Sequence, residues 1–223
     1  MIITAKLSDQ ELQKRIYGSA AEYSKLMGKT FLIIGKNNKT PYFWFECKFE
    51  KKNFMHLLGI KSKTYRADAF FDACLSGYSN EENGGITIND CTPSRNHSRT
   101  TINEKCSCSE EMFRLKEARY MKIGLKDKIS QFVDFTYAYG STATLGFQKQ
   151  EEGVGFPITL IPRSIDEFSS QKYKILFVLD KDIEASQYEH VYAEIKEGLF
   201  KMCYDELPEE LKGLIKIIVQ TET

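Results

Sequence analysis

The chain has 223 residues, of which 42% are hydrophobic and 13% aromatic, so it can build a substantial core and is not intrinsically disordered. It carries 31 basic and 31 acidic residues, a balance that argues against indiscriminate binding to nucleic acid. No apolar run approaches the roughly 18 residues that a membrane span requires, which excludes an integral membrane protein of the helical type.

The N-terminal part predicts a helix followed by a β-hairpin. Ser8 and Glu11 form the pattern of a capping box, and apolar residues follow at three- and four-residue spacing, which predicts a helix over 9–27. The runs TFLIIG and YFWFECKF flank the polar turn at 36–39 and predict two paired strands. The segment RADAFFDACL then predicts a second, short helix.

The middle of the chain is polar. Residues 78–108 are rich in Asn, Ser and Gly, so we expect a long loop, functional or mobile, with one short strand at GITI. The segment SEEMFRLKEARYMKIG predicts a helix that ends near Gly124.

The C-terminal part predicts a sheet and two helices. Four strand patterns, QFVDFTYAY, ATLGFQK, PITLIPRS and KYKILFVLD, are joined by short connections, so neighbouring strands should pair antiparallel. A second capping-box pattern at Ser186–Glu189 and a proline at 208 each predict the start of a helix. The expected fold is therefore α+β: an N-terminal helix and hairpin, a helical middle, a four-stranded antiparallel sheet and two C-terminal helices.

Charge is unevenly distributed along the chain. Residues 36–66 contain eight basic and two acidic side chains, whereas residues 180–223 contain five basic and eleven acidic ones. The basic stretch suggests an anionic partner, although solvated surface charge explains it equally well. The acidic stretch could fold over the basic one and inhibit it.

The absence of common motifs argues against a P-loop NTPase, a dinucleotide-binding enzyme, a zincin or an α/β-hydrolase. The sequence has no P-loop, no GxGxxG, no HExxH and no GxSxG motif. Six cysteines in a chain without an apolar leader favour reduced thiols in a cytoplasmic protein. A zinc site in the 78–108 loop is an alternative, but the spacing of its candidate ligands does not match structural zinc sites. Those candidates are Cys91, His97, Cys106 and Cys108.

His56 is the strongest candidate for catalysis, because an imidazole can both accept and donate a proton near neutral pH. RNA carries its own nucleophile, the 2′-OH, so its cleavage requires only a base, an acid and cations to stabilise phosphate charge. Arg163 is the candidate phosphate stabiliser and Tyr139 a candidate positioning group. Further candidates for contacts with RNA are Lys52, Lys61, Lys126 or Lys128, Tyr137, Ser141, Thr142 and Thr144. Each has a structural interpretation as well: a core histidine, packed tyrosines and a surface ion pair.

The segment Phe54–Gly59, with the pattern F-x-H-L-x-G, follows the hairpin and precedes the aromatic pair Phe70–Phe71. In this it resembles phage-associated members of the barnase–EndoU–colicin–RelE-like nuclease superfamily. The resemblance covers residues 8–182 and implies metal-independent cleavage of RNA, with His56 as the motif histidine and no cofactor. It implies a nuclease-type domain over 1–182, leaving 183–223 as an acidic helical appendage packed on that domain.

Two functions are therefore expected. The first is a ribonuclease-like toxin or effector of a phage or mobile element, acting on RNA such as tRNA. The second is a non-catalytic interaction protein, an inhibitor or anti-defence factor, whose acidic C-terminal helices mimic nucleic acid or dock on a basic partner. The protein partners expected for the chain are a protein inhibitor or a host defence protein. The first function needs His56 and Arg163 to converge on one open cleft, whereas the second allows His56 to be enclosed by the helix at 65–75. In neither case is a membrane the partner.

Overall fold

The computed structural model describes residues 7–39, 42–79, 85–95, 97–127, 135–150 and 153–216. Their α-helices are α1 (Asp9–Ser24), α2 (Lys51–Leu57), α3 (Ala67–Ser79), α4 (Arg99–Phe113), α5 (Leu199–Cys203) and α6 (Glu209–Gly213). Short 3₁₀ helices are η1 (Ile88–Asp90), η2 (Leu115–Tyr120), η3 (Ile165–Glu167) and η4 (Tyr204–Glu206). No helix in these ranges is long and apolar enough to cross a membrane.

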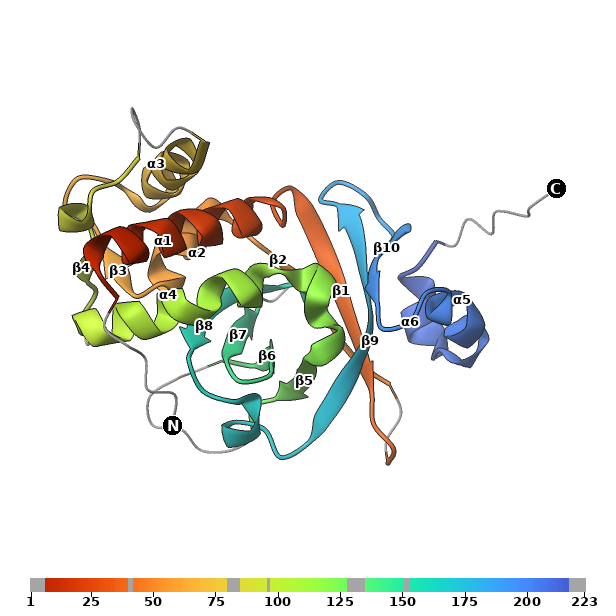
Figure 1. Ribbon diagram of the computed structural model, residues 1–223. Coiled ribbons are helices and arrows are strands. Elements are labelled where there is room, and N and C mark those ends of the chain that lie inside the picture. Colours follow the sequence, from red (N-terminus) through yellow and green to blue (C-terminus); the bar gives the residue numbers. More distant parts are fainter. Residues whose placement is uncertain are drawn as a thin grey trace.

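The strands belong to one large sheet and one small ribbon. The large sheet contains β1 (Lys29–Lys36), β2 (Phe43–Lys48), β5 (Lys122–Leu125), β6 (Tyr137–Gly140), β7 (Thr144–Lys149), β8 (Gly155–Ile161), β9 (Lys172–Asp182) and β10 (His190–Glu194). Their order is β1-β2-β8-β7-β6-β5-β9-β10, and β1 also pairs with β9, so the sheet curves until these strands meet (Figure 1). The ribbon pairs β3 (Ile60–Lys61) with β4 (Thr92–Pro93).

The predicted four-stranded antiparallel sheet is wrong, although the α+β class is right. The sheet has eight strands and is mixed, because β2 pairs in parallel with β8 at Cys47 and Gly155. The hairpin strand β1 is almost continuously buried, since it lies between β2 and β9 in the middle of the sheet. The predicted strand at QFVDFTYAY lies partly outside the described residues, and its described end forms β6.

Helices cover the curved sheet on two sides (Figure 1). The main core joins α1, α2, α3 and α4 to the inner face of β1 and β2, and Tyr23 at its centre contacts four other aromatic rings. On the opposite face of β1 and β9, α5 and α6 pack through Phe200 and Leu211 against Leu32 and Phe177. This second cluster makes the C-terminal segment a structural cover for the sheet.

Local capping patterns predicted some helices correctly. The capping box of Ser8 and Glu11 starts α1 as expected, the hairpin forms, and α3 begins near the predicted position. The predicted helix at 109–124 is wrong in its bounds: α4 starts at Arg99, because Ser98 and Thr101 form a capping box of their own, and Lys122 already begins β5.

Two further predictions are wrong. The GITI segment leads into η1 rather than forming a strand. The pattern at Ser186–Glu189 starts no helix, because Tyr188 is buried in the second cluster and the chain then pairs with β9 as β10. Pro208 precedes α6, as expected.

Candidate functional site

The polar middle of the chain folds back onto α2. The helix ends where the Gly59 amide donates to the His56 carbonyl at 2.9 Å, and Gly59 has a φ of +71°. The ribbon of β3 and β4 follows, and the Ser94 amide donates to the Gly59 carbonyl at 2.9 Å. This pairing places the segment before α4 beside the end of α2, which no local pattern in the sequence predicts.

His97 and Lys105 meet as a result of that folding. His97 lies just before the first turn of α4, and Lys105 lies two turns into the helix. The Lys105 Nζ and His97 Nε2 atoms are 3.2 Å apart and share a hydrogen bond. Lys105 is only 6% exposed, so a lysine nitrogen is held on an imidazole within a largely buried environment.

Gly59 makes room for both side chains. A Cβ atom on Gly59 would lie 2.6 Å from the His97 Cδ2 atom and 3.3 Å from the Lys105 Cδ atom. Positive φ and this close contact both require glycine. The last residue of the F-x-H-L-x-G pattern therefore forms the surface against which His97 and Lys105 pack.

His56 completes the cluster from the last turn of α2. Its side chain is exposed at the surface, not walled in by α3. Partial desolvation and the nearby Lys105 and His97 lower its pKa from the ordinary value of 6.5, while a hydrogen bond to the Ile158 main chain acts in the opposite direction. Neutral imidazole is thus the favoured form of His56 at pH 7.

Burial dominates the ionisation of Lys105. It lowers the pKa of the amine from 10.5 to about 8, although the nearby Cys108 and Cys106 raise it. Such a lysine can hold a positive charge at pH 7 and still release a proton in mildly alkaline solution. His56, His97 and Lys105 are therefore an acid–base group with one embedded cation, and we name them the HHK cluster.

Cations surround the HHK cluster. Lys61 follows Gly59 in β3, and Arg95 lies in the turn before His97; Lys63 and Arg66 are exposed nearby along the chain. Among the described residues, none of these four takes part in an ion pair. By contrast, Lys52, one turn before His56, pairs with Glu50 at 2.6 Å. The free cations favour an anionic ligand at this surface.

The other predicted site residues lie on the sheet and its loops. The Arg163 guanidinium pairs with Glu167 at 3.3 Å and covers the Phe168 ring. Tyr139 is fully buried and donates to the Met112 carbonyl at 2.6 Å, which fixes its hydroxyl in the core. These contacts of Arg163 and Tyr139 are with residues other than His56, and their catalytic roles stay predictions.

The predicted contacts with RNA have structural partners too. Tyr137 stacks on Phe45 with ring centroids 5.3 Å apart, and the buried Thr144 hydroxyl donates to the Arg163 carbonyl. Ser141 lies in the turn between β6 and β7, and Lys126 lies over the Phe135 ring. Thr142 is exposed in that turn, and Lys128 lies outside the described residues. Among the predicted lysines in the described ranges, Lys52 lies on α2 with His56, and Lys61 lies on β3, the strand that follows α2.

Lys105 is the functional candidate that sequence reasoning missed, whereas His97 can join His56 only because its loop folds back, a condition that the sequence leaves open. Ser98 and Thr101 were a usable indication, since a capping pattern there begins a helix at 99 and places Lys105 on the turn above His97. The remaining step, the approach of that helix to α2, depends on long-range pairing of β3 with β4.

The proposed zinc ligands do not gather around a metal position. Within the described ranges, no group of three or more His, Cys, Asp or Glu side chains could hold a metal ion. Cys91 and Cys106 are buried, and burial raises the pKa of the Cys91 thiol to about 12, so it stays protonated near neutral pH. His97 has Lys105 as its partner instead.

One family model matches the chain. The phage-Barnase-EndoU-ColicinE5/D-RelE like nuclease4 model matches residues 15–197, which include the HHK cluster and all strands of the large sheet. Comparisons with curated proteins and with solved structures gave no match.

Proposed function

Since the chain belongs to the phage-Barnase-EndoU-ColicinE5/D-RelE like nuclease4 family, we propose that it cleaves RNA through attack by the RNA's own 2′-OH, with the HHK cluster as its active site. Family membership supports a nuclease and hence a nucleic-acid substrate. The observation that carries the finer proposal is the hydrogen bond between His97 and Lys105 beside the exposed His56.

His56 is the general base in this proposal. Its lowered pKa keeps the imidazole neutral at pH 7, so it can remove the proton from the 2′-OH as the oxygen attacks the phosphorus. The bond from phosphorus to the 5′ oxygen then breaks, and the products are a 2′,3′-cyclic phosphate and a free 5′-OH.

The His97–Lys105 pair is the general acid. A proton shared between the two nitrogens can pass to the departing 5′ oxygen, which otherwise leaves as a poor, charged group. The positive charge of the pair also stabilises the extra negative charge on the phosphorane-like transition state. Lys61 and Arg95, both exposed, are proposed to hold the neighbouring phosphates of the strand.

This chemistry uses side chains alone. Nitrogen atoms of imidazole and amine line the cluster, whereas Mg²⁺ in nucleases is held chiefly by carboxylate oxygens. In the phage context that the family name gives, such an activity suits a toxin or effector that destroys host RNA, for example tRNA, and a protein inhibitor would be its natural partner.

The test is incubation of the purified chain with tRNA and total RNA in EDTA. We expect cleavage products that carry 2′,3′-cyclic phosphates, and no cleavage of an oligonucleotide of the same sequence with 2′-deoxyribose. Equal cleavage of the deoxy oligonucleotide, or cleavage that requires added Mg²⁺, would overturn the 2′-OH mechanism. Intact RNA in every condition would instead favour the non-catalytic interaction protein.

Substituting Gly59 should separate activity from stability. In Gly59→Ala the new Cβ meets His97, whereas in Gly28→Ala, at a similar φ of +75°, no atom lies within 4 Å. We expect both variants to lose about 1–2 kcal/mol of unfolding free energy in urea titrations, because alanine resists the left-handed region. Only Gly59→Ala should also lose RNA cleavage, by roughly tenfold or more, because His97 and Lys105 are displaced. Equal cleavage by both variants would show that the contact with His97 has no catalytic role.

A further inference from the structure

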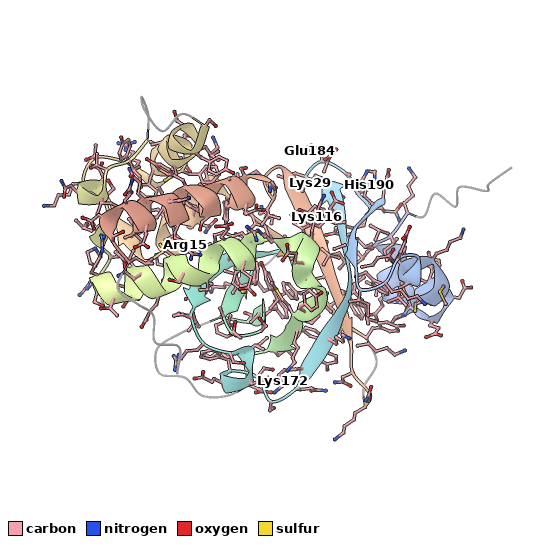
Figure 2. The ribbon with its side chains drawn as sticks, viewed as in Figure 1. Arg15, Lys29, Lys116, Lys172, Glu184 and His190 are labelled. Atoms are coloured by element: carbon pink, nitrogen blue, oxygen red, sulfur yellow. The ribbon has the colours of Figure 1, made fainter. Side chains whose placement is uncertain are left out.

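A second basic site lies far from the HHK cluster along the fold. A cavity of about 870 Å³ opens where the turn after β1, the start of β5 and the start of β9 meet. Five lysines line it, with polar side chains between them: Lys36, Asn37, Asn38, Lys39, Tyr120, Met121, Lys122, Ser170, Gln171, Lys172 and Lys174. We name it the lysine pocket. Figure 2 shows Lys172 at one end of β9, with His190 near the other end.

Strand register brings three of these lysines into a row. Lys174 of β9 is directly opposite Lys36 of β1 on one side and directly opposite Lys122 of β5 on the other. Directly opposite residues share a face of the sheet, and like charges in such positions repel one another. All three side chains are exposed on that face.

Acidic side chains neutralise only part of this row. Asp166 pairs with Lys122 at 3.5 Å and with Lys172 at 2.8 Å, and Glu206 pairs with Lys36 at 3.4 Å. Lys174 and Lys39, at the centre and at the rim of the pocket, have no acidic partner among the described residues. A bound anion would relieve the repulsion between the lysines.

The wall of the pocket is held in place by internal hydrogen bonds, and an aromatic ring lines it. Asn37 holds the turn, accepting from the Lys39 amide at 2.9 Å and donating to the Lys172 carbonyl at 3.4 Å. Tyr120 is 71% exposed at the pocket, and an exposed aromatic ring between cations suits a stacked base. Phosphate groups and an unpaired base of a nucleic-acid strand match both features.

We propose that the lysine pocket binds a single-stranded stretch of the RNA substrate outside the cleavage site. The inference rests on the proposed function, because the strand is taken to be the RNA that the HHK cluster cleaves. Figure 1 shows α2, β3 and β4 grouped with α1, away from the end of β1 and the start of β9 that carry the pocket. By binding one part of an RNA, the pocket would determine which RNA molecules reach the HHK cluster for cleavage.

Binding is tested by fluorescence anisotropy with a labelled 20-nucleotide RNA and the cleavage-deficient His56→Gln variant. We expect Lys39→Gln/Lys174→Gln, introduced in that variant, to weaken binding about tenfold near 0.1 M salt. The slope of log affinity against log salt concentration should decrease by about 1.4, since each phosphate contact on a single strand contributes about 0.7. Lys196→Gln/Lys201→Gln, two exposed lysines in the C-terminal segment, is the control of equal charge. Unchanged binding in the pocket variant, or an equal loss in the control, would overturn the proposal.

Cleavage assays locate the pocket relative to the reaction. With His56 intact, the pocket substitutions should lower kcat/KM for the 20-nucleotide RNA about tenfold more than for a dinucleotide, which is too short to reach both sites. Equal losses on both substrates would place the pocket within the active site and overturn the proposal. If the unsubstituted chain cleaves no RNA, the proposed function fails, whereas the binding comparison still decides whether the pocket holds RNA.

Discussion

Removal of either imidazole of the HHK cluster should lower kcat/KM for RNA cleavage by about 10²–10⁴-fold, as expected for the loss of a general acid or base. Gln is the substitution of choice at His56 and His97, because it retains a polar side chain of similar size. The chain contains only three histidines, and the third, His190, is exposed on β10 outside the cluster. Figure 2 places it near Lys29, at the top of β9 and β10. His190→Gln is therefore the matched control and should cleave RNA as the unsubstituted chain does.

The pH profile distinguishes a base from a structural histidine. A general base acts in its neutral form, and the pKa of His56 lies below 6.5, so kcat/KM should rise with pH along a limb centred below 6.5. That limb should disappear in His56→Gln. In the double variant His56→Gln/His97→Gln, the fold-loss in kcat/KM should be well below the product of the two single fold-losses, because both groups act in one step. If His56→Gln kept the kcat/KM of the unsubstituted chain and the same rise with pH, His56 would not be the general base.

Lys105→Met should lose cleavage and gain stability. The substitution removes the cation beside the scissile phosphate, for which we expect a loss of about 10²–10³-fold in kcat/KM. Folding lowers the pKa of Lys105 from 10.5 to about 8, so below pH 8 the folded chain holds this proton less favourably than the unfolded chain does. Each pKa unit corresponds to about 1.4 kcal/mol, so at pH 7 burial of the charge costs on the order of 3 kcal/mol. Methionine, of similar shape and without charge, should recover roughly 1–3 kcal/mol of this.

The stability cost of the buried Lys105 charge should depend on pH. Between pH 8 and 10.5 the unfolded chain still binds the proton and the folded chain has released it, so the stability of the unsubstituted chain rises with pH in this window. The advantage of Lys105→Met in unfolding free energy should accordingly shrink from pH 8 upward. Lys201→Met, on the exposed face of α5, is the control and should change stability by less than about 0.5 kcal/mol. A destabilised Lys105→Met would mean that the bond to His97 outweighs the burial of charge.

These variants test whether the proposed active site lowers the stability of the chain in return for activity. Lys105 is buried with its nitrogen on His97, and Gly59 combines a positive φ with a position where a Cβ atom would meet the same two side chains. Buried charges and strained backbone of this kind are expected at functional sites, where function is retained at a cost in stability.

The sequence by itself determined features that depend on neighbouring residues. The capping box at Ser8 and Glu11 predicted α1, the polar turn at 36–39 predicted the hairpin, and α3 appeared where its apolar pattern begins. The Phe54–Gly59 segment predicted the nuclease family that the family model confirms. Each of these depends on contacts within a few residues of the chain, which a pattern can express.

Only the tertiary structure decided the rest. β1 pairs with β9 across more than a hundred residues, and β10 replaces a predicted helix because it pairs with the edge of β9. Above all, the pairing of β3 with β4 places His97 and Lys105 at Gly59, beside His56. Such contacts depend on burial and on main-chain hydrogen bonds between segments that are distant in sequence. A pattern of neighbouring residues therefore cannot predict them.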